Sequence, residues 1–173
     1  MVDVITRQTD DIRRIVDEFS KFARMPELRR KNENFSALVE SAVSLQQAGQ
    51  PNVSINLSQP KLPIFTSIDA TLINQALTNI LKNAGESIET RLQDPSTSNH
   101  GGVIEVSLKN EPDVVILNIS DNGVGLPQDR SRLFEPYVTT RDKGTGLGLA
   151  IVKKIIEEHG GVLKLEDALP FEN

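Results

Sequence analysis

The sequence predicts an α+β fold, in which helices pack against a sheet, preceded by a long N-terminal helix. Its 173 residues, 38% of them hydrophobic, are enough for one domain with an appendage. Apolar residues recur at helical spacing in four stretches: residues 2–24, 35–47, 69–88 and 147–159. Four shorter stretches predict strands, most of them by alternation of apolar and polar residues: 53–57, 104–108, 114–119 and 162–165.

The first helix, residues 2–24, carries a seam of apolar residues with heptad-like spacing. The seam consists of Ile5, Ile12, Ile15, Phe19 and Phe22. Pro26 ends the helix, and the basic residues 29–31 separate it from the rest of the chain. This separation favours pairing with another helix, and packing onto its own domain is the alternative.

The ends of the other elements have local signals. Asp69 is a candidate N-cap for the third helix, and Gly160 with Gly161 ends the last one. The turn at residues 111–113 joins the strands on either side of it into an antiparallel hairpin.

The composition excludes several functional classes. Nineteen basic and 24 acidic residues give a net charge of −5, and no basic run is long enough for a nucleic-acid partner. The chain has no cysteine, which excludes disulfides, thiol nucleophiles and cysteine-ligated metals. No apolar run reaches the roughly 18 residues of a membrane span, and residues 1–25 carry charges throughout, so we expect a soluble chain without a transmembrane segment or signal peptide. The lack of cysteine is compatible with a cytoplasmic location.

Two asparagines on the third helix, Asn79 and Asn83, lie one turn apart on one face. An asparagine side-chain oxygen is a hard, neutral ligand that Mg²⁺ accepts alongside phosphate oxygens and water. For this pair taken alone, an ordinary polar boundary beside the apolar stripe is the alternative.

Residues 121–127, Asp-Asn-Gly-Val-Gly-Leu-Pro, follow directly after a predicted strand. Asp-Asn-Gly alone would favour a tight hairpin turn. Gly123 and Gly125, spaced by one residue in a longer loop, indicate instead a close approach of the backbone to a ligand. Asp121 can accept a hydrogen bond from an exocyclic amine such as that of adenine.

Residues 144–149, Gly-Thr-Gly-Leu-Gly-Leu, open the last helix. Glycine-rich backbone at a helix N-terminus favours phosphate, because its N–H groups are unpaired and the helix dipole is positive there. No Gly-Lys-Ser/Thr follows, which excludes a Walker loop. The preceding residues 133–143 combine an aromatic anchor, Phe134, with a threonine- and charge-rich stretch, as a hinged lid over phosphate requires.

In this order, the motifs resemble those of the catalytic, ATP-binding domain of sensor histidine kinases, within the wider family that includes gyrase, Hsp90 and MutL. The asparagine box, first glycine box, phenylalanine box and second glycine box are matched by residues 79–84, 121–125, 134–136 and 144–148. The resemblance implies a two-layer α/β sandwich, a mixed sheet packed on helices, which is the Bergerat ATP-binding fold.

The resemblance also implies a division of the chain. Residues 32–173 would form the catalytic domain, and residues 1–31 a linker with part of the second helix of the dimerisation and phosphotransfer hairpin. The hairpin helix and the short lid resemble the NtrY type of nitrogen-regulation sensor kinase. The chain is expected to begin inside the hairpin and to end before the closing strand of the domain.

By the same resemblance, Asn83 would coordinate Mg²⁺, and Asp121 would accept from the adenine amine of ATP. The candidate catalytic residues are Asn79, Asn83 and Lys143. Lys143 and Arg141 are the candidates for cationic contacts with phosphate. The candidate ATP-binding residues are Asn79, Lys82, Asn83, Asp121, Gly123, Gly125, Phe134, Thr139, Thr140, Arg141, Lys143, Gly144, Thr145, Gly146, Leu147, Gly148 and Leu149.

Two departures from the wider family affect the expected chemistry. ATP-hydrolysing members carry a glutamate base four residues before the helix asparagine, where this chain has Asn79. An amide cannot take a proton from water, so we expect phosphoryl transfer to another nucleophile. Many sensor kinases carry a basic residue and an aromatic after the asparagine box, where this chain has Glu86 and Ser87. This leaves open which cation meets the γ-phosphate and what stacks on adenine.

The phosphate acceptor of the family is a histidine on the first hairpin helix, and neither His100 nor His159 matches it. His159 ends the last helix, where a structural or capping role is expected. We therefore expect transfer to a histidine outside these residues, on the hairpin of the same homodimeric protein. A cognate response regulator would be the next partner, and the parent protein would be anchored in the bacterial inner membrane. The alternatives are an anti-sigma-type or other protein kinase of this fold, and an inactive nucleotide-binding interaction module.

Overall fold

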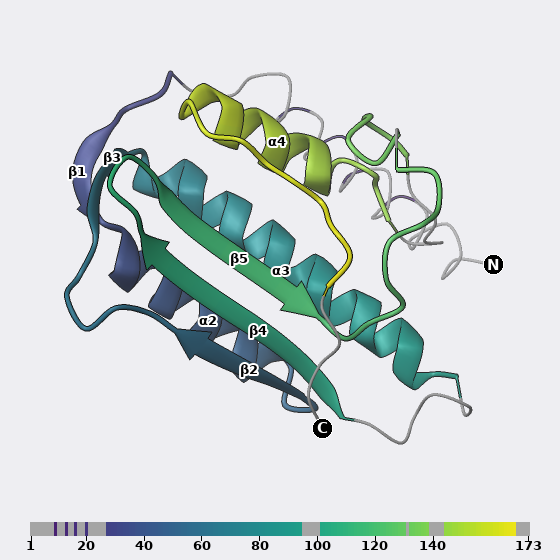
Figure 1. The fold of residues 1–173 in the computed structure, drawn as a ribbon. Helices are drawn as coiled ribbons and strands as arrows, with labels where there is room; N and C mark the ends of the chain where they lie inside the picture. The colour runs from purple at the N-terminus through teal and green to yellow at the C-terminus, as the bar shows by residue number, and fades with distance from the viewer. Residues whose placement is uncertain are drawn as a thin grey trace.

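The structure, a computed structural model, describes residues 9, 13, 16, 20, 27–94, 101–130, 132–138 and 144–168. Its elements (Figure 1) are β1 (Lys31–Asn34), α2 (Phe35–Gly49), β2 (Val53–Ser58), β3 (Phe65–Ile68), α3 (Ala70–Leu92), β4 (Gly102–Asn110), β5 (Val115–Asp121) and α4 (Gly148–Glu158). Residues 9, 13, 16 and 20 are helical, and the apolar seam predicted for residues 2–24 lies outside the described residues.

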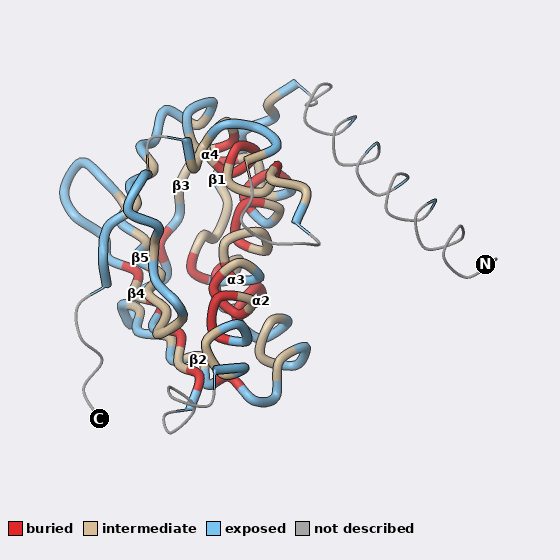
Figure 2. The backbone as a smooth tube through the Cα atoms, turned by 90° about the vertical axis from the view of Figure 1, so that its right-hand side faces the viewer, coloured by how far each residue is buried: buried red, intermediate tan, exposed pale blue. Residues whose placement is uncertain are grey.

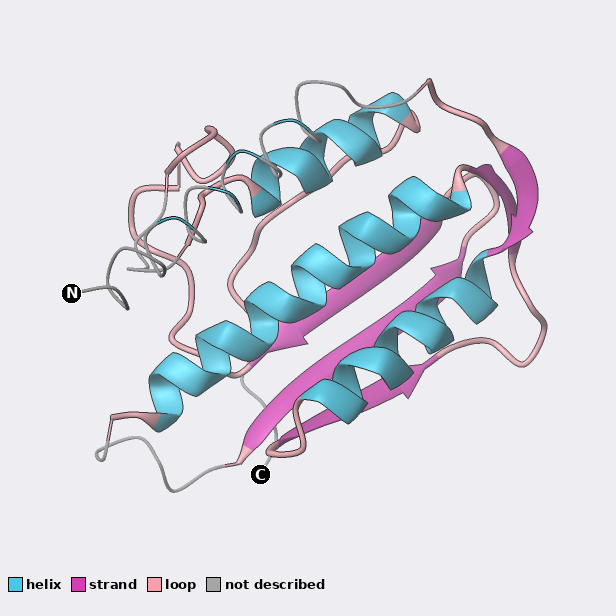
Figure 3. Ribbon diagram, turned by 180° about the vertical axis from the view of Figure 1, so that it is seen from behind, coloured by secondary structure: helices cyan, strands magenta, loops and turns pink. Residues whose placement is uncertain are grey.

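The domain has two layers. One layer is a three-stranded sheet in the order β2-β4-β5, in which β2 runs parallel and β5 antiparallel to β4. Helices α2, α3 and α4 lie side by side on one face of this sheet (Figure 3). β1 and β3 form a separate antiparallel pair just before α2 and α3. The predicted two-layer sandwich with a mixed sheet is confirmed.

The hydrophobic core lies between the two layers, where Figure 2 shows the buried residues. The apolar stripe predicted for α3 is buried along its length, from Leu72 at 3% exposure to Ile88 at 0%. The largest fully buried side chains come from α2, α3, β4 and the region of α4: Val39, Leu81, Ile88, Ile104, Val106, Leu147, Val152 and Ile155. Each such side chain contributes about 1.5–3 kcal/mol through burial.

Asp69 caps α3 and also holds the segment that precedes β1. Its Oδ1 accepts from the N–H groups of Thr71, at 3.1 Å, and Leu72, at 3.2 Å. Its Oδ2 accepts from the N–H of Arg29 at 3.0 Å. Partial burial opposes ionisation of Asp69, but these backbone donors and the nearby His159 hold its pKa below the ordinary value of 3.8.

His159 joins the end of α4 to the start of α3. Its Nε2 accepts from the backbone N–H of Asp69 at 3.0 Å, and its Nδ1 lies 2.8 Å from the carbonyl oxygen of Ile155. In this arrangement Nδ1 is the donor and Nε2 the acceptor. The Arg30 guanidinium donates to the carbonyl of Glu158 next to it. His159 therefore has the structural role predicted from its position.

The strand predicted at residues 162–165 is wrong, because residues 161–168 pair with no strand. Leu163 packs against the core, whereas Val162 is 81% exposed. The apolar character of this segment is therefore explained by the packing of Leu163 and not by strand hydrogen bonds. Conversely, β1 and β3 were not predicted. Each is only four residues long, and β1 (Lys-Asn-Glu-Asn) has no apolar alternation.

Replacing the cap should destabilise the domain in a pH-dependent way. We expect Asp69→Ala to cost about 1 kcal/mol of unfolding free energy at pH 7, measured by urea denaturation. Because the folded pKa of Asp69 is lowered, its stabilisation is fully present above the unfolded pKa and is lost as pH falls through the folded one. The difference in unfolding free energy between wild type and Asp69→Ala should therefore become smaller below about pH 4.

Asp69→Asn is the matched control, because an amide oxygen can still accept the Thr71 and Leu72 bonds. We expect the unfolding free energy of Asp69→Asn at pH 7 to be closer to that of wild type than the unfolding free energy of Asp69→Ala is. If the loss of unfolding free energy in Asp69→Ala stayed constant down to pH 2, the result would contradict the role of the carboxylate charge.

Candidate functional site

Helix α3 carries the two predicted asparagines one turn apart on one face, and Asn83 lies beside the start of α4. Asn79 and Asn83 are both half-buried. A Cβ built on Gly148 would lie 3.7 Å from Nδ2 and 3.9 Å from Oδ1 of Asn83, so the amide faces the first residue of α4. Lys82 is exposed on the neighbouring face, where its Nζ lies 3.8 Å from Oε1 of Glu86. The structure thus brings Asn83 and the second glycine loop, residues 144–148, together.

The N-terminus of α4 presents uncapped backbone donors. Its N-cap residue is Leu147, and within the described residues no side-chain capping hydrogen bond is made there. Leu147 is fully buried and fixes the start of the helix, while Gly148 and Leu149 are half-buried. Thr145 Oγ1 accepts a long 3.5 Å bond from the Leu147 N–H. Helix N–H groups without a side-chain cap are suited to bind phosphate oxygens.

Gly146 is packed against the end of the predicted phenylalanine box. It has φ +67°, and a Cβ there would lie 2.6 Å from the carbonyl carbon of Tyr137 and 2.7 Å from the backbone nitrogen of Val138. Tyr137 itself has φ +68°, and its N–H donates to the carbonyl of Gly146 at 3.1 Å. This contact brings the residue pair before position 139 next to Gly146, which follows position 143. Because a Cβ at position 146 would collide with Tyr137 and Val138, only glycine fits there.

Phe134 packs onto α4. The Nζ of Lys153 lies 5.1 Å from the centroid of its ring, a cation–π distance. Next to it, Arg132 and Glu135 form an ion pair at 2.9 Å. The sequence identified Phe134 as an ATP contact, and in the structure its ring faces a lysine that sequence reasoning did not single out.

Four candidate residues of the lid lie outside the described residues: Thr139, Thr140, Arg141 and Lys143. The cationic contacts expected from Arg141 and Lys143 therefore stay predictions. Gly144, which follows them, is exposed.

The first glycine loop, residues 121–125, leaves β5 at Asp121. One oxygen of this carboxylate, Oδ1, accepts from the N–H of Gly123 at 3.0 Å, and Oδ2 has no hydrogen bond within the described residues. Gly125 has φ +78°, the left-handed conformation that glycine adopts without strain. The loop therefore presents one carboxylate oxygen of the predicted adenine acceptor.

Sequence reasoning gave no role to two residues that hold this loop. The side chain of Asn122 accepts from the N–H of Val103 at 2.9 Å and donates to the carbonyl of Gly101 at 2.9 Å, which fixes the loop to β4. Ser87 Oγ accepts from the N–H of Val124 at 3.2 Å, which fixes it to α3. The signal for Ser87 was its spacing, since positions 79, 83 and 87 follow one face of α3 at four-residue steps.

The donor set fits ATP with Mg²⁺. Within the described residues, Oδ2 of Asp121 has no hydrogen bond and suits an amine, and the start of α4 has no side-chain cap and suits phosphates. Within the described residues, no group of three or more His, Cys, Asp or Glu could hold a metal ion by itself. A cation at Asn83 would therefore complete its coordination with phosphate oxygens and water, as Mg²⁺ commonly does.

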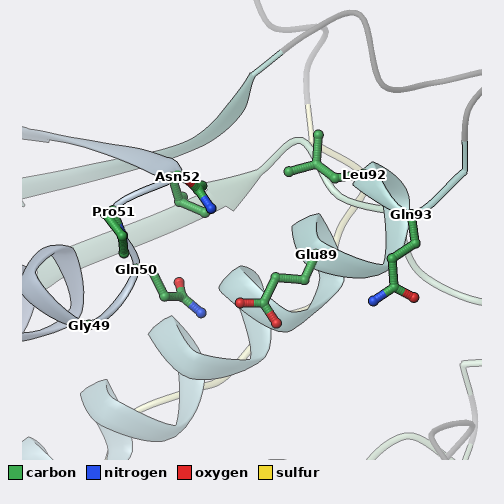
Figure 4. A pocket seen from close by; sticks show the side chains of 8 residues that line it. Gly49, Gln50, Pro51, Asn52, Glu89, Leu92 and Gln93 are labelled. Atoms are coloured by element: carbon green, nitrogen blue, oxygen red, sulfur yellow. The ribbon is translucent and has the colours of Figure 1, made fainter.

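A separate hollow of about 350 Å³ lies at the ends of α2 and α3. Gln50, Glu89 and Gln93 line it from the two sides (Figure 4). Gln50 Oε1 is buried without a partner, and the Gln50 amide occupies the space beside Gly85 where a Cβ would otherwise lie. None of the predicted site residues lines this hollow, so it is not the predicted nucleotide site.

Comparison with known proteins decides the family. The model of the histidine kinase-, DNA gyrase B-, and HSP90-like ATPases matches residues 68–170, which include all four motifs. The chain belongs to this family. Nitrogen regulation protein NtrY of Azorhizobium caulinodans is 49% identical over 168 residues, which are 96% of this chain and 21% of that protein. The chain thus spans about a fifth of the length of this relative.

Solved structures agree with the family. A mycobacterial sensor histidine kinase, MprB, matches with a TM-score of 0.63 and 25% identity over 76% of this chain and 81% of its own. Histidine kinase ThkA, solved in complex with response regulator protein TrrA, matches with a TM-score of 0.70 over 92% of this chain and 44% of its own. At 22% identity, the ThkA match shows a shared fold alone. The expected resemblance to sensor histidine kinases of the NtrY type is confirmed.

Within the part of the chain that the structure describes, no helix is long and apolar enough to cross a membrane.

Gly146→Ala should disrupt the contact with Tyr137. A left-handed backbone costs a non-glycine residue about 1–3 kcal/mol, and the added Cβ would also collide with backbone atoms. We expect a lower melting temperature and weaker nucleotide binding, measured by calorimetry. Gly49→Ala, at the end of α2, is the control, because a Cβ there meets nothing within 4 Å. Equal stability of the two variants would contradict the packing described for Gly146.

Proposed function

We propose that this domain binds ATP with Mg²⁺ and transfers the γ-phosphate to a histidine side chain of a phosphoacceptor hairpin. The observation that carries the proposal is the juxtaposition of Asn83 with Gly148, which puts a metal-ligating amide beside an uncapped helix N-terminus. A magnesium ion bound there would neutralise phosphate charge and orient the γ-phosphate.

Different described residues bind the base and the phosphates of the nucleotide. Oδ2 of Asp121 accepts from the adenine amine, and Gly125 lets the loop backbone pass close to the purine. The N–H groups at the start of α4 bind the phosphates. Arg141 and Lys143 are the proposed cationic contacts, and the NtrY relative supports a role in nitrogen-related signalling.

Asn79 favours transfer over hydrolysis. The side chain is half-buried on the same face of α3 as Asn83, where a base for water would have to stand. An amide has no lone pair basic enough to remove a proton from water at neutral pH. The incoming nucleophile is then the acceptor imidazole, which needs no such base on this helix.

The wider organisation is also proposed. Residues 1–31 form the linker and part of the second hairpin helix, residues 32–173 form the catalytic domain, and the hairpin pairs two copies of the protein. A response regulator receives the phosphate from the histidine. Because ATP is the substrate, the domain works in the cytoplasm, and the parent protein is anchored in the inner membrane.

Calorimetric titration with ATP and Mg²⁺ tests the site. Removing a hydrogen bond to a charged group costs about 1.5–3 kcal/mol, so Asp121→Ala should weaken ATP binding by roughly 10- to 150-fold. Asn83→Ala should weaken ATP binding in Mg²⁺ and leave binding in EDTA little changed. If both variants bound ATP with Mg²⁺ as tightly as wild type, the site assignment would be wrong.

A phosphotransfer assay tests the reaction. With a supplied acceptor hairpin from an NtrY-type kinase, radiolabelled ATP should label the hairpin, and the label should be lost in acid and stable in base. Without the hairpin, the domain should release little phosphate. An acid-stable product would favour a serine kinase of the same fold, and binding without any transfer would favour an inactive module.

A further inference from the structure

The first glycine loop, residues 121–125, is held against α3 by a contact that no part of the proposed chemistry requires. Ser87 is nearly buried, at 9% exposure, and its Oγ accepts from the N–H of Val124 at 3.2 Å. A Cβ at Gly123 would lie 2.1 Å from this Oγ and 2.6 Å from the Ser87 carbonyl carbon. The loop backbone therefore lies directly on the surface of the helix at this residue.

The contact restrains the carboxylate of Asp121 through a short chain of bonds. Asp121 Oδ1 accepts from the N–H of Gly123, and the next N–H, of Val124, is held by Ser87. On the other side, Asn122 is fixed to β4. The carboxylate is thus located between two anchors, one on the sheet and one on α3.

We infer that Ser87 is a positioning residue that sets the selectivity of the site for adenine over guanine. The inference rests on the proposed function, because it concerns the same nucleotide. Adenine presents an amine donor at position 6, whereas guanine presents a carbonyl acceptor there, an N–H donor at ring position 1 and an amine donor on position 2. A carboxylate fixed opposite position 6 accepts from adenine and faces the guanine carbonyl with like partial charge.

Selectivity of this kind depends on where the carboxylate stands and not only on its presence. A shift of the loop along the edge of the base would bring the carboxylate opposite the ring N–H of guanine. The carboxylate could then accept a hydrogen bond from that N–H. Ser87 opposes that shift, because moving the loop away from α3 would leave the Val124 N–H without its hydroxyl partner.

The test is calorimetric titration of wild type and Ser87→Ala with ATP and with GTP, each with Mg²⁺. Loss of one hydrogen bond corresponds to roughly a fivefold change. We expect Ser87→Ala to lower ATP affinity and to leave GTP affinity unchanged or raised, so that the ratio of ATP to GTP affinity falls at least about fivefold.

Ser36→Ala is the matched control. Ser36 is also buried, at 5% exposure, and its Oγ accepts from the N–H of Ile64 at 3.0 Å, away from the site. It should lower the melting temperature about as much as Ser87→Ala and leave the ATP to GTP ratio at the wild-type value.

The remaining outcomes separate the inference from the function on which it rests. If Ser87→Ala binds ATP with the wild-type ratio, or loses affinity for both nucleotides equally, Ser87 is merely structural and the inference is overturned while the proposed function stands. If wild type binds no ATP, the proposed function fails, and the inference fails with it.

Discussion

The site depends on the close approach of two loops to one face of α3. Asn83 faces Gly148 at van der Waals distance, and Ser87 faces Gly123, where a Cβ would collide with the serine side chain. Asn83 and Ser87 are four residues apart, so the two contacts are separated by about 6 Å along the helix axis. The opposite face of α3 is buried against the sheet, which prevents the helix from moving away from either loop.

Under the proposed function, this arrangement would give the nucleotide a direction. The loop that leaves β5 at Asp121 meets α3 near Ser87, and the uncapped start of α4 meets it one turn earlier, near Asn83. The proposed amine acceptor and the proposed phosphate site are thus ordered along one helix, which would place the purine towards its C-terminal half. Because the same helix supplies the core stripe, the spacing between base and phosphate sites is set by α-helical geometry and not by flexible loops.

Periodicity and local chemistry predicted the parts of the fold that depend on neighbouring residues. The stripe of α3, its cap at Asp69 and the hairpin of β4 and β5 follow from spacings within a few turns, and the structure contains all three. The pairing of β1 with β3 could not be predicted, because the Lys31–Asn34 strand has no apolar alternation and its partner lies more than 30 residues away. The strand predicted at residues 162–165 was wrong for the converse reason, since apolar side chains do not by themselves supply a hydrogen-bonded partner.

The same distinction applies to the site. Glycines and asparagines in motif order could be identified from the chain, but Ser87 gains its contact only when β5 delivers Val124 to α3, across 37 residues of sequence. A similar long-range junction lies at the other end of α4, where Arg30 and His159 join the linker, α3 and the helix end. Since α4 begins at the proposed phosphate-binding loop and ends at this junction, a displacement of its N-terminus would act either on its packing against α3 or on the junction with Arg30 and Asp69. The buried Val152 and Ile155 anchor α4 in the core against such a displacement.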